Sequence, residues 1–292
     1  MFTGSLVAII TPMTADGAVD FDGLGRLIDM HVDAGTDGLV VAGTTGESAT
    51  LSKTEHVAVI EAAVEFARGR LPVIAGTGSN STAQTIELSE RVDLLEVDAY
   101  LVVTPYYNKP PQQGLVEHFS AVADAVTKPV MLYNVPGRTG VDLLPETVAR
   151  LCDHPRIFGI KEAAGEVKRV GQLRELCGDD FYLYSGDDPT AREFMLAGGN
   201  GVVSVTANVA PAGMAAMCKA ALGGDAGLAA EIDDALADLH HNLFVESNPI
   251  PVKWALERLG LAEAGIRLPL VRMDVSNEPV VEAALQRAGL LT

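Results

Sequence analysis

The stretch Ile157-Phe158-Gly159-Ile160-Lys161 is the most informative of the short apolar runs from which this fold is inferred, because it ends in a lysine. The run has the length of a buried strand, and Glu162-Ala163-Ala164-Gly165 follows it as a turn. A lysine among apolar neighbours loses hydration of its ammonium, which favours the free amine. A free amine in an apolar pocket can form a Schiff base with a carbonyl substrate. The alternative from spacing alone is a lysine whose ammonium reaches solvent at the strand end.

Seven further runs of strand length occur in the chain, and segments with helical spacing separate them. The other runs are Leu6–Ile10, Gly38–Val41, Pro72–Ala75, Ala99–Val103, Val130–Tyr133, Tyr182–Ser185 and Gly201–Val205. Strands that alternate with helices form parallel sheets. Eight such units in about 200 residues predict an α/β protein with a (β/α)8 or TIM barrel. A doubly wound open sheet is the structural alternative.

The pattern changes after about residue 224, where the strand runs stop. Helical spacing continues in Ala226–Val245, Pro251–Leu259 and Pro279–Leu290. We therefore expect a catalytic barrel in residues 1–224 and a small C-terminal helical region in residues 225–292.

Two helix starts have the sequence of a capping box, in which a serine and a later acidic or amide side chain satisfy each other's backbone N–H groups. The first is Ser52-x-x-Glu55, and Gly69 is placed to end that helix. The second is Ser81-x-x-Gln84. Both lie in gaps between the strand runs, so they support the alternation of strands and helices.

The chain of 292 residues is strongly acidic, with 39 Asp and Glu against 21 Lys and Arg and a formal net charge of −18. This charge argues against nucleic acid and anionic membranes as partners. Anionic substrates therefore require a local cationic or amide-rich pocket. No apolar run approaches the ~18 residues of a membrane span, and the N-terminus has no signal-peptide pattern.

The cysteines Cys152, Cys177 and Cys218 are widely spaced and form no C-x-x-C pair. This usage predicts reduced, structural thiols in a cytoplasmic protein. No metal-ligand cluster is visible in the sequence. The glycines at Gly76 and Gly78 lack the third glycine of a dinucleotide fingerprint and are interpreted as a strand-to-helix turn. We therefore expect no cofactor and no metal.

Polar motifs follow the predicted strands, at the end of a barrel where catalytic residues gather. They are Gly43-Thr44-Thr45-Gly46-Glu47-Ser48, Thr104-Pro105-Tyr106-Tyr107-Asn108, Tyr133-Asn134-Val135-Pro136-Gly137-Arg138-Thr139-Gly140, Lys161, Ser185-Gly186-Asp187-Asp188 and the segment near Val203-Ser204. A carbonyl substrate with a carboxylate needs an amine nucleophile, an anion cradle and a proton shuttle. Lys161, the Thr44-Thr45 turn and Tyr133 supply these groups from three strands.

Each of these motifs also has a structural interpretation. The Gly43–Gly46 segment is explained by a tight turn as well as by an anion site. Tyr133 is explained as a core aromatic and Arg138 as a surface ion-pair partner. The pair Asp187-Asp188 is interpreted as a cap of the next helix rather than a metal site. The pair His240-His241 shows no partner pattern and is interpreted as structural or exposed.

In combination, the motifs around Thr44, Tyr133 and Lys161 resemble the pyruvate-dependent class I aldolase superfamily, and within it the dihydrodipicolinate synthase family. The resemblance extends from Phe2 to Lys253. It implies a lyase of lysine and diaminopimelate biosynthesis that needs no cofactor. The implied reaction condenses pyruvate with L-aspartate-4-semialdehyde through a lysine Schiff base and yields 4-hydroxy-tetrahydrodipicolinate.

The resemblance also implies roles for individual residues. Lys161 matches the Schiff-base lysine, Tyr133 the proton shuttle, and Thr44 the hydroxyl that links Tyr133 to a second tyrosine, Tyr107. In the family this second tyrosine enters from the neighbouring subunit, so the expected protein is a homo-oligomer, a tetramer built as a dimer of dimers. The expected substrate-binding residues are Thr45 for the pyruvate carboxylate, Arg138 for the semialdehyde carboxylate, and Gly186 and the Val203 carbonyl as lesser contacts.

Two other functions remain open at this point. One is another pyruvate-dependent aldolase, such as an N-acetylneuraminate lyase or a 2-keto-3-deoxy sugar acid aldolase, which shares the lysine and the tyrosine. Arg138 and Tyr107 favour the synthase over these enzymes. The other is a non-catalytic sensor on the same barrel. The nucleophile Lys161 argues against it, because a protein that only binds its ligand needs no nucleophile.

Inhibited members of the family bind lysine at the dimer interface, which implies a possible allosteric lysine site here. The matching positions are Ser48, Ala49, Lys53, His56, Asn80, Gln84 and Tyr106. Inhibited enzymes typically carry histidine at position 53 and glutamate at position 84, and this chain departs at both. We therefore expect weak or absent inhibition by L-lysine.

Overall fold

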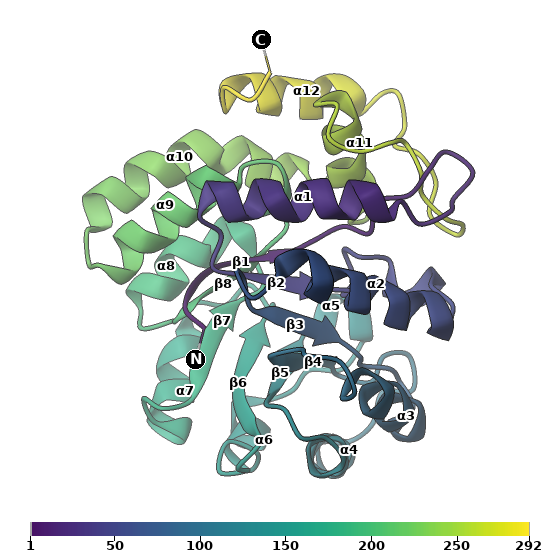
Figure 1. Ribbon diagram of the computed structural model, residues 1–292. Helices are drawn as coiled ribbons and strands as arrows, with labels where there is room; N and C mark the ends of the chain where they lie inside the picture. Colours follow the sequence, from purple (N-terminus) through teal and green to yellow (C-terminus); the bar gives the residue numbers. More distant parts are fainter. Residues whose placement is uncertain (1, 292) are drawn as a thin grey trace.

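The computed structural model describes residues 2–291 and is a closed barrel of eight parallel strands surrounded by helices (Figure 1). The strands are β1 (Gly4–Ala8), β2 (Gly38–Val41), β3 (Val73–Gly76), β4 (Ala99–Val103), β5 (Val130–Asn134), β6 (Ile157–Glu162), β7 (Tyr182–Ser185) and β8 (Gly201–Ser204). Each strand pairs with the next in sequence, and β8 pairs with β1. The predicted TIM barrel is confirmed, and the alternative of an open sheet is wrong.

The outer layer consists of helices that follow the strands, with short 3-10 helices (η) in some connections. They are α1 (Phe21–Ala34), η1 (Ser48–Thr50), α2 (Lys53–Ala67), α3 (Thr82–Val92), α4 (Gln112–Ala125), α5 (Pro136–Thr139), α6 (Pro145–Ala149), α7 (Lys168–Cys177), η2 (Asp188–Thr190), α8 (Ala191–Leu196), η3 (Thr206–Asn208) and α9 (Pro211–Leu222). These helices cover the outer face of the sheet, so the strands are buried on both faces.

Side chains alternate along each strand and so divide the core into two parts. Leu6, Val40, Ile74 and Met131 belong to a buried cluster inside the barrel. Their sequence neighbours, such as Val7, pack outward in the larger cluster formed with the helices. Because both faces are apolar, the strands appear in the sequence as continuous runs.

Of the two predicted capping boxes, one is complete and the other is half formed, and one predicted helix end is displaced by a residue. Ser52 and Glu55 form the complete capping box of α2. That helix ends at Arg68, which adopts the left-handed conformation with a φ of 51° one residue before the predicted Gly69. Ser81 accepts from the backbone N–H of Gln84, but the Gln84 side chain accepts from Ser79 instead of completing the box.

Three helices follow the barrel, α10 (Ala226–Asn242), α11 (Ile250–Arg258) and α12 (Glu278–Arg287). Helix α10 packs along α9, and α12 packs against α10 and α11. No helix within residues 2–291 is long and apolar enough to cross a membrane. Within the same residues, no cluster of three or more His, Cys, Asp or Glu side chains is arranged to hold a metal ion.

Candidate active site

A cavity of about 330 Å³ opens at the C-terminal ends of the barrel strands. It brings together most of the residues singled out from the sequence, although they come from five separate segments of the chain. The predicted residues that line it are Thr44, Thr45, Tyr133, Arg138, Lys161 and Gly186. Ala8, Val40 and Leu101 also line it, so the cavity combines polar groups with apolar side chains.

Lys161 lies in this cavity beside Tyr133. The two residues are direct neighbours across β5 and β6, and the Lys161 Nζ lies 4.2 Å from the centroid of the Tyr133 ring. Both residues are only 6% exposed. The lysine therefore does not extend into bulk solvent, and the alternative of a lysine whose ammonium reaches solvent at the strand end is wrong.

Gly186 gives the lysine side chain its room. A Cβ at this position would lie 2.8 Å from Cε of Lys161 and 2.7 Å from Cβ of Ala163. Carbon atoms do not approach so closely without a shift of one of them. A side chain at position 186 would therefore displace the Lys161 side chain. This steric requirement explains the glycine better than the minor substrate contact that the sequence predicts for Gly186.

The Thr44-Thr45 turn connects β2 to η1 and carries two residues with left-handed backbone. Ala42 has a φ of 53° and Glu47 a φ of 54°, a conformation that costs energy in residues other than glycine. Thr45 is buried, and its hydroxyl accepts a hydrogen bond of 2.9 Å from Nδ2 of Asn248. The contact from the distant C-terminal region therefore holds the turn against the cavity, and such contacts offset the cost of the strained backbone.

Arg138 lies at the mouth of the cavity on the short helix α5. Its guanidinium donates to the backbone carbonyl of Asn248 at 3.3 Å, and it forms no ion pair within the described residues. The alternative of a surface ion pair is therefore wrong. An unpaired guanidinium beside a cavity is free to bind an incoming carboxylate.

Tyr107 and Val203 do not line this cavity. The Tyr107 side chain is 88% exposed, and its backbone N–H donates to the carbonyl of Thr139. Val203 is buried with the apolar side chains inside the barrel, and Val205 lines the cavity instead. Within one chain, therefore, the structure does not bring Tyr107 to the lysine.

The sequence did not reveal Asn248 as a site residue, and it did not reveal the two hydrogen-bond partners of His240. Asn248 lines the cavity, donates to Thr45 and accepts from Arg138, and so touches both predicted carboxylate-binding residues. His240 also lines the cavity and has two partners, Thr206 at 2.9 Å from Nδ1 and Asp233 at 3.2 Å from Nε2. The sequence pattern did not show these partners, but the burial of His240 agrees with its interpretation as structural. Asn248 carried no local signal, since its contacts lie over 100 residues away.

The two aspartates after β7 do not cap the following helix as expected. The Asp188 carboxylate accepts from the backbone N–H groups of Val205 and Thr206, at 2.9 and 3.0 Å, and so braces the end of β8. Asp187 accepts from the Thr190 hydroxyl and lines the cavity. The adjacent His241 lines the cavity as well and is exposed.

A second cavity of about 520 Å³ lies next to the first and shares Thr44, Val135, Arg138 and Asn248 with it. Six of the seven residues proposed for a lysine site line it, namely Ser48, Ala49, Lys53, His56, Gln84 and Tyr106, whereas Asn80 does not. Burial lowers the pKa of His56, whose Nε2 lies 2.7 Å from the carbonyl of Gly76. The Lys53 ammonium is paired with Glu87 at 2.5 Å.

Comparison with known proteins gives one consistent result. Residues 1–288 match the model of the dihydrodipicolinate synthetase family. The chain is 58% identical over 291 residues to the 4-hydroxy-tetrahydrodipicolinate synthase of Alcanivorax borkumensis, covering 100% of this chain and 99% of the relative. It superposes on the chloride-inhibited dihydrodipicolinate synthase from Acinetobacter baumannii complexed with pyruvate, with a TM-score of 0.98, 49% identity and full coverage of both chains.

A lysine-bound enzyme of the same kind from Cyanidioschyzon merolae is 40% identical, with a TM-score of 0.96 and 99% coverage of each chain. The fold, the buried lysine and tyrosine, and these full-length similarities agree with one another. The chain therefore belongs to the dihydrodipicolinate synthetase family.

Proposed function

We propose that this chain condenses pyruvate with L-aspartate-4-semialdehyde to form 4-hydroxy-tetrahydrodipicolinate, with Lys161 as the nucleophile. The 4-hydroxy-tetrahydrodipicolinate synthase activity is that of its close full-length relatives. The observation that carries the proposed mechanism is the buried Lys161 amine, 4.2 Å from the Tyr133 ring in a cavity that also holds Thr45 and Arg138. The product belongs to lysine and diaminopimelate biosynthesis.

The first half of the reaction needs only pyruvate. Neutral Lys161 adds to the ketone carbon, and loss of water gives an imine that tautomerises to an enamine. Thr45 is positioned by Asn248 to receive the pyruvate carboxylate. Proton transfers accompany the addition, the dehydration and the tautomerisation, and Tyr133 beside the amine is suited to mediate them.

The second half needs the semialdehyde. The enamine carbon attacks the aldehyde, and the substrate amine then displaces Lys161 and closes the ring. Arg138 at the mouth of the cavity is suited to the carboxylate of this substrate, because its planar guanidinium offers two parallel N–H donors. Gly186 completes the proposed surroundings of the substrate, with Val205 lining the cavity in place of Val203.

The proposed proton relay includes a residue from a second subunit. Thr44 would link Tyr133 to Tyr107 of a neighbouring subunit, since Tyr107 of the same chain points to solvent and is 88% exposed. Tyr106 is also partly exposed beside it. These exposed aromatic side chains support an oligomer, which we propose to be a tetramer built as a dimer of dimers.

The three cysteines bear on the location of the protein. They are free, which suits a reducing compartment, and we propose that the protein is cytoplasmic.

The C-terminal region of residues 225–292 is proposed as a helical unit appended to the barrel of residues 1–224. This unit nevertheless serves the site, because His240, Phe244 and Asn248 line the cavity.

A coupled assay tests the proposal. The protein is mixed with pyruvate, L-aspartate-4-semialdehyde and the reductase that consumes the product, and oxidation of the reductase's nicotinamide cofactor is followed. The expected result is turnover that Lys161→Ala abolishes. Turnover of N-acetylneuraminate or a 2-keto-3-deoxy sugar acid, with none of the semialdehyde, would instead identify another aldolase.

A further inference from the structure

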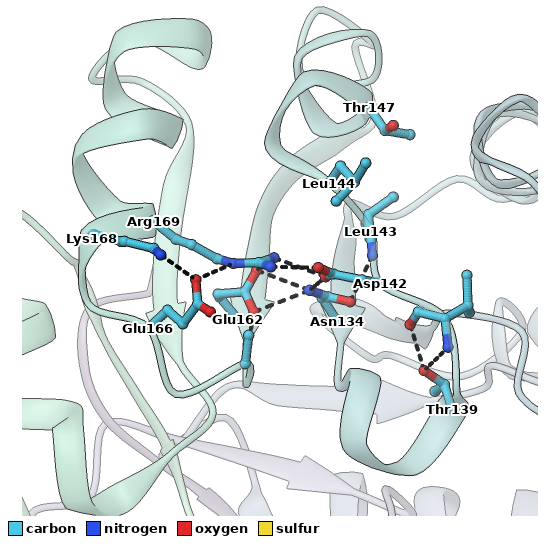
Figure 2. A network of polar contacts seen from close by, with 12 residues as sticks. Asn134, Thr139, Asp142, Leu143, Leu144, Thr147, Glu162, Glu166, Lys168 and Arg169 are labelled. Carbon is cyan, nitrogen blue, oxygen red and sulfur yellow. Dashed lines mark hydrogen bonds and ion pairs between the residues drawn. The ribbon is translucent and has the colours of Figure 1, made fainter.

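Figure 2 shows a polar cluster at the ends of β5 and β6, and its two strand residues are the sequence neighbours of the proposed catalytic pair. Asn134 follows Tyr133 at the end of β5, Glu162 follows Lys161 at the end of β6, and these two residues are also neighbours across the strands. Because side chains alternate along a strand, Tyr133 and Lys161 point into the barrel while Asn134 and Glu162 point outward. Each outward residue is thus one peptide bond away from a residue of the proposed machinery.

Asn134 uses all of its polar side-chain atoms within the cluster. Its Nδ2 donates to both carboxylate oxygens of Glu162 at 3.1 Å and to Asp142 Oδ1 at 2.8 Å. Its Oδ1 accepts from the backbone N–H of Leu143 at 2.9 Å. Glu162 in turn accepts from the backbone N–H of Ala164 at 2.8 Å. The ends of β5 and β6 are therefore joined by side chains as well as by the sheet.

Arg169 of α7 closes the cluster from the helix layer, as Figure 2 shows. Its guanidinium holds both oxygens of Asp142, at 2.5 and 2.9 Å, and lies 3.4 Å from Glu162 Oε2. Arg169 and Glu162 are buried. One fixed cation thus pairs with two carboxylates that come from different segments, and the bidentate geometry fixes its orientation.

The cluster also reaches the segment that carries Arg138. Asp142 and Leu143 lie just beyond the turn formed by α5 and Gly140, and both bond to the Asn134 side chain. The turn itself is closed by the Thr139 hydroxyl, which donates to the carbonyl of Val141 at 2.8 Å. A single set of buried contacts therefore joins the three segments that present Tyr133, Lys161 and Arg138.

Stability alone does not call for charge at these positions. The preceding outward-facing residues, which lie two positions earlier, are Leu132 on β5 and Ile160 on β6. Both are apolar and belong to the core formed with the helices. Apolar residues can replace buried ion clusters without loss of stability. Polar and charged side chains replace apolar ones at Asn134 and Glu162, immediately after the two proposed catalytic residues. At this place the orientation of Tyr133 and Lys161 matters more than the burial of apolar surface.

Resting on the proposed function, we propose that Glu162, Asn134 and Arg169 are positioning residues that hold Lys161 and Tyr133 at the separation needed for imine formation. They touch no substrate and act through the backbone of β5 and β6. Small displacements of reacting groups slow enzymes by large factors. Loosening the cluster should therefore slow the attack of Lys161 on pyruvate more than it weakens the binding of the second substrate.

The test uses Glu162→Gln in the full-length protein, with Glu166→Gln as its matched control. Glu166 lies 3.6 Å from Nε of the same Arg169 but is half-exposed and touches no strand end. The rate of imine formation at saturating pyruvate is measured by borohydride quenching and intact mass. We expect Glu162→Gln to reduce this rate by roughly ten- to a hundredfold, with kcat/KM for the semialdehyde within about twofold. Glu166→Gln should leave both unchanged.

Two further variants separate positioning from folding. Val130→Ala truncates an outward apolar side chain on β5 and lowers stability without touching the cluster. Arg169→Lys keeps the cation but loses the bidentate contact with Asp142. If Glu162→Gln does not fold, the rate of imine formation is measured in Arg169→Lys instead. A normal rate of imine formation in a folded Glu162→Gln or Arg169→Lys protein, or an equal loss in Val130→Ala, would overturn the inference. Absence of imine in the unaltered protein would instead refute the proposed function.

Discussion

Glu47 and Lys253 form a buried ion pair that joins the loop after β2 to helix α11. The Glu47 side chain is fully buried and Lys253 is 4% exposed. Burial lowers the pKa of Lys253, and the Glu47 carboxylate opposes this shift. The other Glu47 oxygen accepts from the backbone N–H of Arg267 at 3.1 Å. Together with the Asn248 contact to Thr45, this pair braces the proposed pyruvate loop against the C-terminal region.

The pair should make a large contribution to stability that depends on both partners. Lys253→Met leaves the Glu47 carboxylate buried without its cation, and we expect a loss of about 3–5 kcal/mol in the free energy of unfolding. The double variant Glu47→Leu with Lys253→Met removes both charges and should recover more than half of that loss. Urea unfolding at one fixed protein concentration measures both values.

The exposed pair Arg272–Glu257 provides the control for this prediction. Its side chains are 61% and 33% exposed, so Arg272→Met should change stability by less than about 1 kcal/mol. Equal losses for Lys253→Met and Arg272→Met would show that burial of the Glu47–Lys253 pair has no special effect.

Lys161 should be the site of covalent labelling by substrate. Borohydride reduces an imine to a stable amine, so treatment with pyruvate should add a pyruvyl mass to the peptide that contains Lys161. Lys161→Ala should abolish the label, and Lys253→Met, which removes the other buried lysine, should retain it. Peptide mass spectrometry makes the measurement, and a label on another residue with Lys161 unmodified would contradict the mechanism.

Arg138 should act on the second substrate rather than on pyruvate. Its guanidinium lies at the mouth of the cavity, whereas imine formation occurs at Lys161 within it. Arg138→Ala should therefore lower kcat/KM for the semialdehyde by roughly ten- to a hundredfold, which corresponds to the loss of a charge-assisted bond of about 1.5–3 kcal/mol. Borohydride trapping of pyruvate should change much less. Equal losses in both measurements would indicate that Arg138 supports the turn instead.

Tyr107 should link activity to oligomerisation. Its side chain is 88% exposed and lies outside the cavity of its own chain. If it completes the site of a neighbour, mixed oligomers of Tyr107→Phe and Lys161→Ala subunits should regain partial activity, because one composite site contains both native residues. Activity is compared before and after subunit exchange that is verified by mass. No recovery after complete exchange would mean that Tyr107 does not act across subunits.

The barrel was predictable because buried strands leave a strong local signal. All eight apolar runs overlap an observed strand, and the differences are confined to ends such as Ile9 and Ile10, which extend past β1. Lys161 was recognisable for the same reason, since a charged residue interrupts an apolar run. The positions of both could be inferred from neighbouring residues and the rules for barrel strands.

The residues that support the site were not predictable, because their partners are distant in the sequence. Asn248 meets Thr45 across 203 residues, and Lys253 meets Glu47 across 206. The Thr206 partner of His240 lies 34 residues earlier, although its other partner, Asp233, is only 7 residues away on α10. These pairings depend on how the C-terminal helices pack on the barrel, which no local pattern specifies.

Lysine feedback should be weak in this protein, because the second cavity lacks an anion at position 84. A glutamate there would pair with an ammonium of bound lysine, whereas Gln84 offers only a dipole and accepts from Ser79. Lys53 can only donate, and its ammonium is already paired with Glu87, so it is not free to bind the effector carboxylate. A charge-assisted bond contributes ~1.5–3 kcal/mol against about 1 for a neutral one. We therefore expect Gln84→Glu to tighten lysine binding by roughly tenfold.

Inhibition by L-lysine is measured in the coupled assay for the unaltered protein and for Gln84→Glu. The control is Glu90→Gln, which changes a charge on the same helix at a position that does not line the cavity. This variant should leave inhibition unchanged, because its side chain is exposed and charges there are screened by solvent. Strong inhibition of the unaltered protein at low micromolar lysine would contradict the prediction, since it would show that Lys53 and Gln84 suffice to hold the effector.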